Sequence, residues 1–196
     1  MISLRRRFVL SSLVLGVAAI SPAVALGANS TNLPLKGKST AVVATDISTT
    51  PATVTVSSSG HFSHLGAFIA IGNESLTPLG APPVIPYRLT GSETLIMANG
   101  DNVFGAVNGT GVNNSGATSG TNLVTITGGT GRFANAAGSY TETYTGQIFS
   151  QIGTTMLGPV HTTIRGHIRL GGGYVDPLAG HQTHHQRHQR RGSSSA

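Results

Sequence analysis

The residues best suited to do chemistry lie in one extended segment, residues 139–148. Successive side chains of a β-strand point to opposite faces, so Tyr140, Glu142 and Tyr144 share one face while threonines occupy the other. Two phenol rings make the first face mostly apolar, and we expect it to point inward. Desolvation there favours the neutral form of a carboxyl group, which suits it to proton transfer. The pattern predicts Glu142 as a candidate catalytic acid–base and Tyr140 and Tyr144 as ligand-binding residues.

A second interpretation of this segment gives Glu142 no chemical role. In a reversed register, or with Glu142 at the solvated rim of the fold, the carboxyl group is an ordinary surface charge. Both interpretations stay open on the sequence alone.

The histidines and the absence of cysteine argue against a structural metal centre. His61 and His64 are three residues apart, which places them on opposite faces of a strand. His161 and His167 alternate with arginines on one strand face and are expected on the surface. Four further histidines within residues 181–188 could bind metal ions, but that segment offers no fixed geometry. We therefore predict neither a metal site nor a cofactor.

The glycine-rich segment 127–134 superficially matches a dinucleotide-binding turn. That fingerprint needs a following helix inside a parallel βαβ unit, whereas residues 135–145 have the pattern of a turn and a strand. As a hairpin connection, its glycines allow a tight turn and let Arg132 and Phe133 fold back over the end of the domain. Because the sequence predicts neither that helix nor a parallel βαβ unit, we exclude nucleotide binding.

The formal charge of +6 belongs mostly to the ends of the chain, where arginines cluster. Between residues 26 and 173 there are six Lys or Arg and five Asp or Glu. A near-neutral body is not expected to carry the clustered positive field that follows a phosphate backbone. We predict no nucleic-acid partner.

The elements that must position these residues are strands. Residues 36–170 are rich in Thr, Val, Ser and Gly, carry Gly or Asn clusters every ten to twenty residues, and show no helical periodicity. The predicted strands are 36–46, 52–58, 62–71, 87–98, 102–109, 121–128, 138–149 and 155–170, with a Pro-rich loop over 78–86. Eight sequential strands without crossover helices favour a closed antiparallel barrel, with a sandwich as the alternative.

The ends of the chain lie outside this predicted barrel. Residues 1–25 have a basic start, an apolar stretch and a small-x-small cleavage site, typical of a signal peptide of either the general or the twin-arginine type. Residues 26–35 are interpreted as a linker and 171–196 as a disordered tail rich in Gly, His and Arg. No apolar stretch is long enough to span a membrane, so we expect a secreted or periplasmic protein.

The segment 126–138 carries a family resemblance. Its residues, ITGGTGRFANAAG, resemble the GGTG-(R/K)-F-x-x-A-x-G signature of dirigent-like and allene oxide cyclase-like β-barrels, and 63–68 resembles a segment of exported bacterial proteins. The resemblance implies an eight-stranded antiparallel barrel with an apolar lumen, often assembled into homo-oligomers. Members with known roles guide a small unsaturated molecule through cyclisation or radical coupling. No catalytic residue of those families is matched to a position here.

Two functions follow from these observations. The first is an exported barrel that binds a small apolar molecule or serves as a non-catalytic secreted or surface protein. The alternative is an isomerase or cyclase that acts on a small unsaturated substrate in the lumen, with Glu142 handling a proton. A third idea is that the His- and Arg-rich tail binds metal or an anionic surface.

Overall fold

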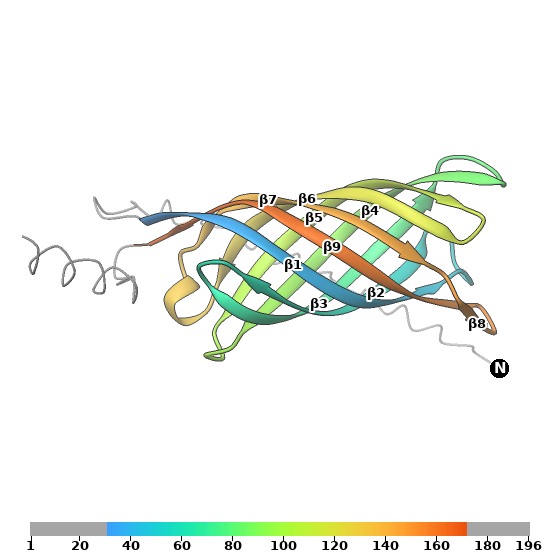
Figure 1. The fold of residues 1–196 in the computed structure, drawn as a ribbon. Coiled ribbons are helices and arrows are strands. Elements are labelled where there is room, and N and C mark those ends of the chain that lie inside the picture. Colours follow the sequence, from blue (N-terminus) through green and yellow to red (C-terminus); the bar gives the residue numbers. More distant parts are fainter. Residues whose placement is uncertain (1–30, 172–196) are drawn as a thin grey trace, which may run out of the picture.

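The chain folds into a β-barrel, shown in Figure 1 as a computed structural model that describes residues 31–171. The elements of the described residues are nine strands and one 3-10 turn: β1 (Thr31–Asp46), β2 (Ala52–Phe62), β3 (Gly66–Pro78), β4 (Val84–Met97), β5 (Asn102–Asn114), β6 (Ala117–Gly129), η1 (Gly131–Phe133), β7 (Ala137–Gln147), β8 (Ser150–Ile152) and β9 (Thr155–Leu170). The predicted signal peptide and all but the first residue of the predicted tail lie outside the described residues.

Antiparallel pairing closes the sheet on itself. Each strand from β1 to β7 pairs with the next, β7 pairs with β9, and β9 pairs with β1 along sixteen residues from Thr31 to Asp46. The short β8 pairs only with β9 and extends the wall at one rim. Closure leaves eight wall strands with few free edges. The predicted eight-stranded antiparallel barrel is confirmed.

The predicted linker over 26–35 is wrong in its last five residues, because β1 begins at Thr31. Leu33 and Leu35 point inward and are buried, which continues the strand alternation past Pro34. β1 pairs with β2 only from Gly37 onward, so the strand ladder around Pro34 is formed with β9. Proline is tolerated at such an edge because no ladder hydrogen bond is needed from its nitrogen.

The Pro-rich loop is also shorter than predicted. β3 runs to Pro78 and β4 begins at Val84, so the connection is confined to residues 79–83.

The interior of the barrel divides into two halves along its axis. In the half that holds the connections β2–β3, β4–β5 and β6–β7, side chains fill the lumen. Phe62 stacks on Phe68 with ring centroids 4.6 Å apart and meets Tyr140 edge-on at 6.3 Å. Phe133 of η1 is fully buried in the same cluster, so the glycine-rich segment does fold back over this end of the barrel, as predicted. Gly128 and Gly131 have φ values of 135° and 52°, which only glycine adopts freely.

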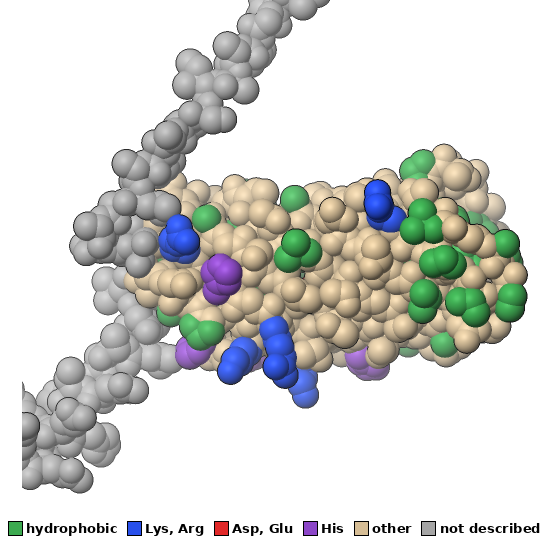
Figure 2. Space-filling model, turned by 90° about the horizontal axis from the view of Figure 1, so that it is seen from above, with side chains coloured by type: hydrophobic (Ala, Val, Ile, Leu, Met, Phe, Trp, Pro, Cys, Tyr) green, Lys and Arg blue, Asp and Glu red, His purple; other side chains and the backbone are tan. Residues whose placement is uncertain are grey.

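Basic side chains lie on the outside of the barrel while most of the acidic ones point into the lumen, which the near-zero net charge of residues 26–173 does not reveal. Lys36 pairs across strands with Arg165, and Lys38 and Arg169 lie on the same two strands, all exposed. Figure 2 shows Lys, Arg and His side chains gathered on part of one face, with no acidic side chain visible there. The expectation that the body carries no clustered positive field is therefore wrong, because three of its five acidic residues turn into the lumen. The absence of a nucleic-acid partner stays a prediction.

Candidate ligand-binding site

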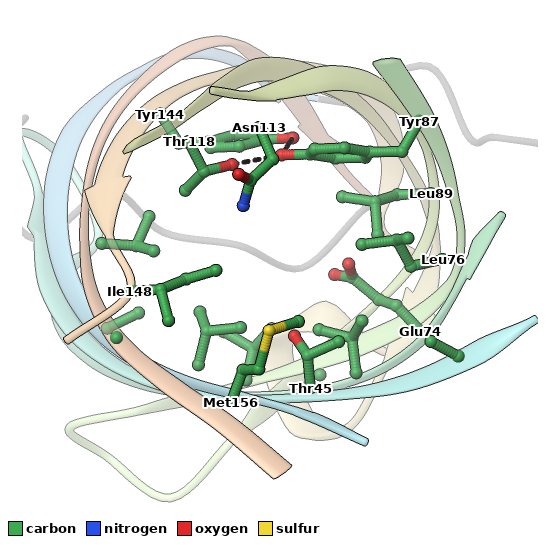
Figure 3. A pocket seen from close by; sticks show the side chains of 18 of the residues that line it. Thr45, Glu74, Leu76, Tyr87, Leu89, Asn113, Thr118, Tyr144, Ile148 and Met156 are labelled. Carbon is green, nitrogen blue, oxygen red and sulfur yellow. Dashed lines mark hydrogen bonds between the residues drawn. The ribbon is translucent and has the colours of Figure 1, made fainter. Parts of the chain in front are cut away.

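The other half of the lumen holds a cavity of about 550 Å³. Its mouth lies at the end of the barrel that bears the connections β1–β2, β3–β4, β5–β6 and β7–β9, and Ile47, Pro78 and Gly116 belong to its lining. Figure 3 shows side chains from many strands converging on this space. The volume falls in the range of small-molecule sites, roughly 300 to 1,000 Å³.

The wall of the cavity is mostly aliphatic. Leu89 and Val54 are buried in it, and four partly buried side chains pack against them. Those four are Val43, Val56, Leu76 and Val160. They come from β1, β2, β3 and β9, so apolar surface surrounds the space rather than covering one side.

Two tyrosines form a hydrogen-bonded pair on this wall. The Tyr87 hydroxyl lies 3.1 Å from the Tyr144 hydroxyl and 2.6 Å from Thr118 Oγ1. Both phenol ends lie over Gly111, where an added Cβ would come within 2.6 Å of each hydroxyl oxygen. Burial, together with the hydrogen bond to Tyr87, raises the pKa of Tyr144, so it stays protonated.

Three glutamates line the inner part of the cavity. Glu74 of β3, Glu93 of β4 and Glu142 of β7 all point inward, and the exposed fractions of Glu74 and Glu93 are 8% and 9%. Glu93 has glycine as its cross-strand partner on both sides, Gly72 and Gly105, which leaves room for its carboxyl group. On β6, Asn122 faces Glu142 across the strands and donates from Nδ2 to Glu142 Oε2 at 3.3 Å.

Burial keeps these carboxyl groups from ionising at their usual pH. Desolvation, and then the charge of Glu142, raises the pKa of Glu74 to about 7. Desolvation also raises the pKa of Glu93 well above its usual value, with further contributions from Glu142 and Glu74. The pKa of Glu142 is raised by desolvation, although the hydrogen bond from Asn122 opposes the shift. Among the described residues, no Lys, Arg or His lines the cavity to offset this cost.

Two acceptor atoms in this cluster have no partner. Glu93 Oε1 and Asn122 Oδ1 are shielded from solvent and accept no hydrogen bond from any described residue. Buried polar atoms are normally hydrogen-bonded, so both atoms call for a partner that residues 31–171 do not supply.

The structure brings together some of the residues predicted from the sequence and separates others. Glu142 points into the barrel, which excludes the reversed register, and Tyr144 lines the same cavity. Tyr140 does not: it is 2% exposed, packs against Phe62 in the filled half, and is absent from the cavity lining. The prediction that Tyr140 contacts a ligand is corrected accordingly. Whether Glu142 is catalytic stays a prediction.

Sequence reasoning missed Glu74, Glu93, Asn122 and Tyr87. A signal for the glutamates was present, because Glu74 continues the inward series Phe68, Ala70 and Gly72 on its strand. Glu93 likewise stands between the inward residues Leu89 and Leu95. The alternation that selected Glu142 selects both of them when it is extended to these strands.

Within residues 31–171, no three His, Asp or Glu side chains are grouped closely enough to hold a metal ion. The same part of the chain contains no helix whose length and hydropathy would let it cross a membrane.

Comparisons with known proteins find little. No protein-family model matches the chain, and no curated protein matches it. Among solved structures, a pterocarpan synthase dirigent protein is similar, with a TM-score of 0.37 and 13% sequence identity over 75% of this chain and 88% of that chain. At these values the similarity assigns neither a family nor a function to this chain.

Proposed function

We propose that this protein binds a small, largely apolar molecule in the open half of its barrel and acts as an exported, non-catalytic binding protein. The observation that carries the proposal is the contrast between the two halves of one lumen. One half is filled by aromatic and aliphatic side chains, whereas the other keeps a cavity of about 550 Å³ with an aliphatic wall. An apolar wall around a few polar groups is the usual composition of a small-molecule site.

The mouth of the cavity supports the same proposal. Large apolar side chains of the surrounding connections are exposed there, among them Leu79, Phe149 and Ile152, the last two with exposed fractions of 69% and 68%. Figure 2 shows hydrophobic side chains gathered at this end of the barrel. An apolar rim gives an apolar ligand a favourable first contact before it enters the lumen.

Filling the cavity tests the proposal. We expect Leu89→Trp to weaken binding of the neutral hydrocarbon fluorophore diphenylhexatriene by roughly tenfold or more, because the indole ring occupies the space beside Leu76. Fluorescence titration of the full-length protein measures the dissociation constant. The matched control is Leu123→Trp, which places the same ring on the outer face, where Leu123 is 50% exposed.

The result is informative only if both variants are folded, which far-UV circular dichroism and the thermal midpoint establish. Equal binding by wild type, Leu89→Trp and Leu123→Trp would place the fluorophore outside the lumen and remove the proposal. Binding lost in Leu89→Trp alone would support it.

A second candidate function is an isomerase or cyclase acting on a small unsaturated substrate in the same cavity. The observation that favours it is that two glutamates, Glu74 and Glu142, line one cavity. Burial raises the pKa of Glu74 to about 7, and a carboxyl group that titrates near neutral pH exchanges protons readily. In such a reaction one carboxylate removes a proton next to a carbonyl group, and a carboxylic acid returns a proton two carbons further along. No co-reactant is consumed.

A β,γ-unsaturated cyclic ketone is a suitable probe, since its conjugated isomer absorbs in the ultraviolet. If this function is correct, the full-length protein should speed the conversion, and Glu142→Gln should lower the rate roughly tenfold or more. Asp101→Asn, which lies on the β4–β5 connection at the filled end, is the matched control. No acceleration by wild type, or equal acceleration by Glu142→Gln, would remove Glu142 from any proton transfer on this substrate class.

A further inference from the structure

We infer that the ligand is an amphiphilic amine, whose protonated nitrogen lies at the inner end of the cavity among Glu74, Glu93, Glu142 and the side-chain oxygen of Asn122. This inference rests on the proposed binding function and deepens it by naming the chemical class of the ligand.

The hydrogen-bonding groups at the inner end are mostly acceptors that need donors. Asn122 is 6% exposed, and its amide is oriented by the hydrogen bond that Nδ2 donates to Glu142. This orientation leaves Asn122 Oδ1 without a partner among residues 31–171, and Glu93 Oε1 likewise has none; both residues line the cavity. A primary ammonium group has three N–H donors and no acceptor, which complements such a set.

The charge of the cluster points to a cation. The three carboxyl groups repel one another when ionised, as the effects of Glu142 on Glu74 and Glu93 show. The other titratable groups facing the cavity are the phenols of Tyr87 and Tyr144, which are bonded to each other. Buried charges in proteins are normally paired, and the residues lining this cavity offer no basic side chain as the partner. A ligand cation supplies the missing charge.

A metal ion is a poorer complement than an organic cation. Oxygen ligands hold Ca²⁺ or Mg²⁺ at roughly 2.0 to 2.6 Å, which requires the carboxylates to converge on one point. The described part of the chain contains no such group of acidic side chains or histidines. An ammonium group on a flexible stem accepts longer and more widely spread contacts.

The rest of the cavity specifies what the nitrogen is attached to. Outside the glutamate cluster the wall is mostly aliphatic, with Leu76, Leu89 and Val54 around the space. The polar groups there include the hydroxyls of Tyr87, Tyr144 and Thr118, and none of the residues lining that part of the cavity is basic or acidic. Burying hydrocarbon against these side chains is favourable, whereas a second charge there would be desolvated without a partner. The ligand therefore carries its charge at one end and hydrocarbon over the remainder.

A matched pair of probes tests the inference on the full-length protein. Naphthylethylamine and naphthylethanol have the same ring and chain and differ at one terminal group, and the amine is protonated from pH 5 to pH 8.5. By isothermal calorimetry, we expect the amine to bind at least roughly tenfold more tightly than the alcohol at pH 8.5. The advantage should shrink at pH 5, where the raised pKa values of Glu74 and Glu93 leave their carboxyl groups protonated.

Variants locate the charge that the amine recognises. In the Glu74→Gln/Glu142→Gln double variant the preference for the amine should disappear, whereas Asp101→Asn should keep it. If the double variant does not fold, the pH dependence of the wild type still decides the question. The inference is overturned by equal binding of both probes at both pH values, or by an amine preference that survives the double substitution.

These outcomes separate the inference from the proposed function. If diphenylhexatriene binds in the lumen but the amine has no advantage, the apolar site stands and the amine is wrong. If neither the fluorophore nor either probe binds, the proposed function and the inference both fail.

Discussion

At pH 8 this barrel should be less stable than at pH 5, by about 2 to 3 kcal/mol from Glu74 alone. Most acidic groups in proteins act in the opposite direction, because pairing lowers their pKa in the folded state. Here burial without a basic partner raises the pKa of Glu74 from 4.5 to about 7. The folded state then binds the proton more tightly than the unfolded chain does.

The sign follows from proton linkage. A group whose pKa is raised by folding contributes its full stabilisation below the unfolded pKa, and this is lost as the pH rises through the folded pKa. For Glu74 the loss begins near pH 4.5 and is largely complete just above pH 7. Glu93 and Glu142, whose pKa values are also raised by burial, add to the loss as the pH rises. Asp46 has a lowered pKa because of its hydrogen bond from the Ser48 backbone, and affects stability only below about pH 4.

Thermal unfolding between pH 5 and pH 8 measures this effect. We expect the midpoint to fall by about 5 to 10 °C across the range. Glu74→Gln should flatten the profile and be more stable than wild type at pH 8, since it keeps the size of the side chain without the charge. Asp46→Asn is the matched control and should leave the slope unchanged. A wild-type midpoint that is flat or rises towards pH 8 would mean that these carboxyl groups are solvated and ionised in the lumen.

The strand pattern of the sequence predicts the barrel well, for a physical reason. A wall with a filled interior on one side and water on the other imposes a period of two on every strand, and residues 160–170 show that period throughout. The errors lie where alternation competes with another signal. Pro34 obscured the two inward-pointing leucines at the start of β1. The Pro-rich residues 78–86 obscured the last residue of β3 and the first residues of β4.

The candidate site was only partly predictable, because its composition depends on how strands are staggered against one another. Alternation places Glu142 inside, but it does not say that Glu74 and Glu93 from two other strands reach the same level of the lumen. That level is set by the register, which puts Glu93 opposite Gly72 and Gly105. The same limitation explains Tyr140. Tyr140 shares a strand face with Tyr144, four residues away. It nevertheless packs against Phe62 of β2 in the filled half of the lumen.

The division of the lumen into halves should also be measurable as a difference in the stability lost when either of two leucines on one strand is truncated. Leu95 and Leu89 both lie on β4, and their side chains are nearly equally hidden, with exposed fractions of 4% and 7%. Leu95 has buried Ala70 and Val103 as its cross-strand partners. Leu89 instead lies between Leu76 and Gly109 and faces the cavity.

We expect Leu95→Ala to lower the free energy of unfolding by about 3 to 4 kcal/mol, and Leu89→Ala by only about 1 to 2 kcal/mol. Truncating Leu95 opens a new void inside a packed cluster, so its neighbours lose their contacts outright. Truncating Leu89 enlarges a space that already exists, so fewer contacts are lost. Urea unfolding followed by circular dichroism gives both values, and similar m-values in the two variants would confirm that the folded and unfolded states are comparable. Equal costs at the two positions would mean that the outer half of the lumen closes on itself in solution, and a closed lumen has no room for the ligand proposed here.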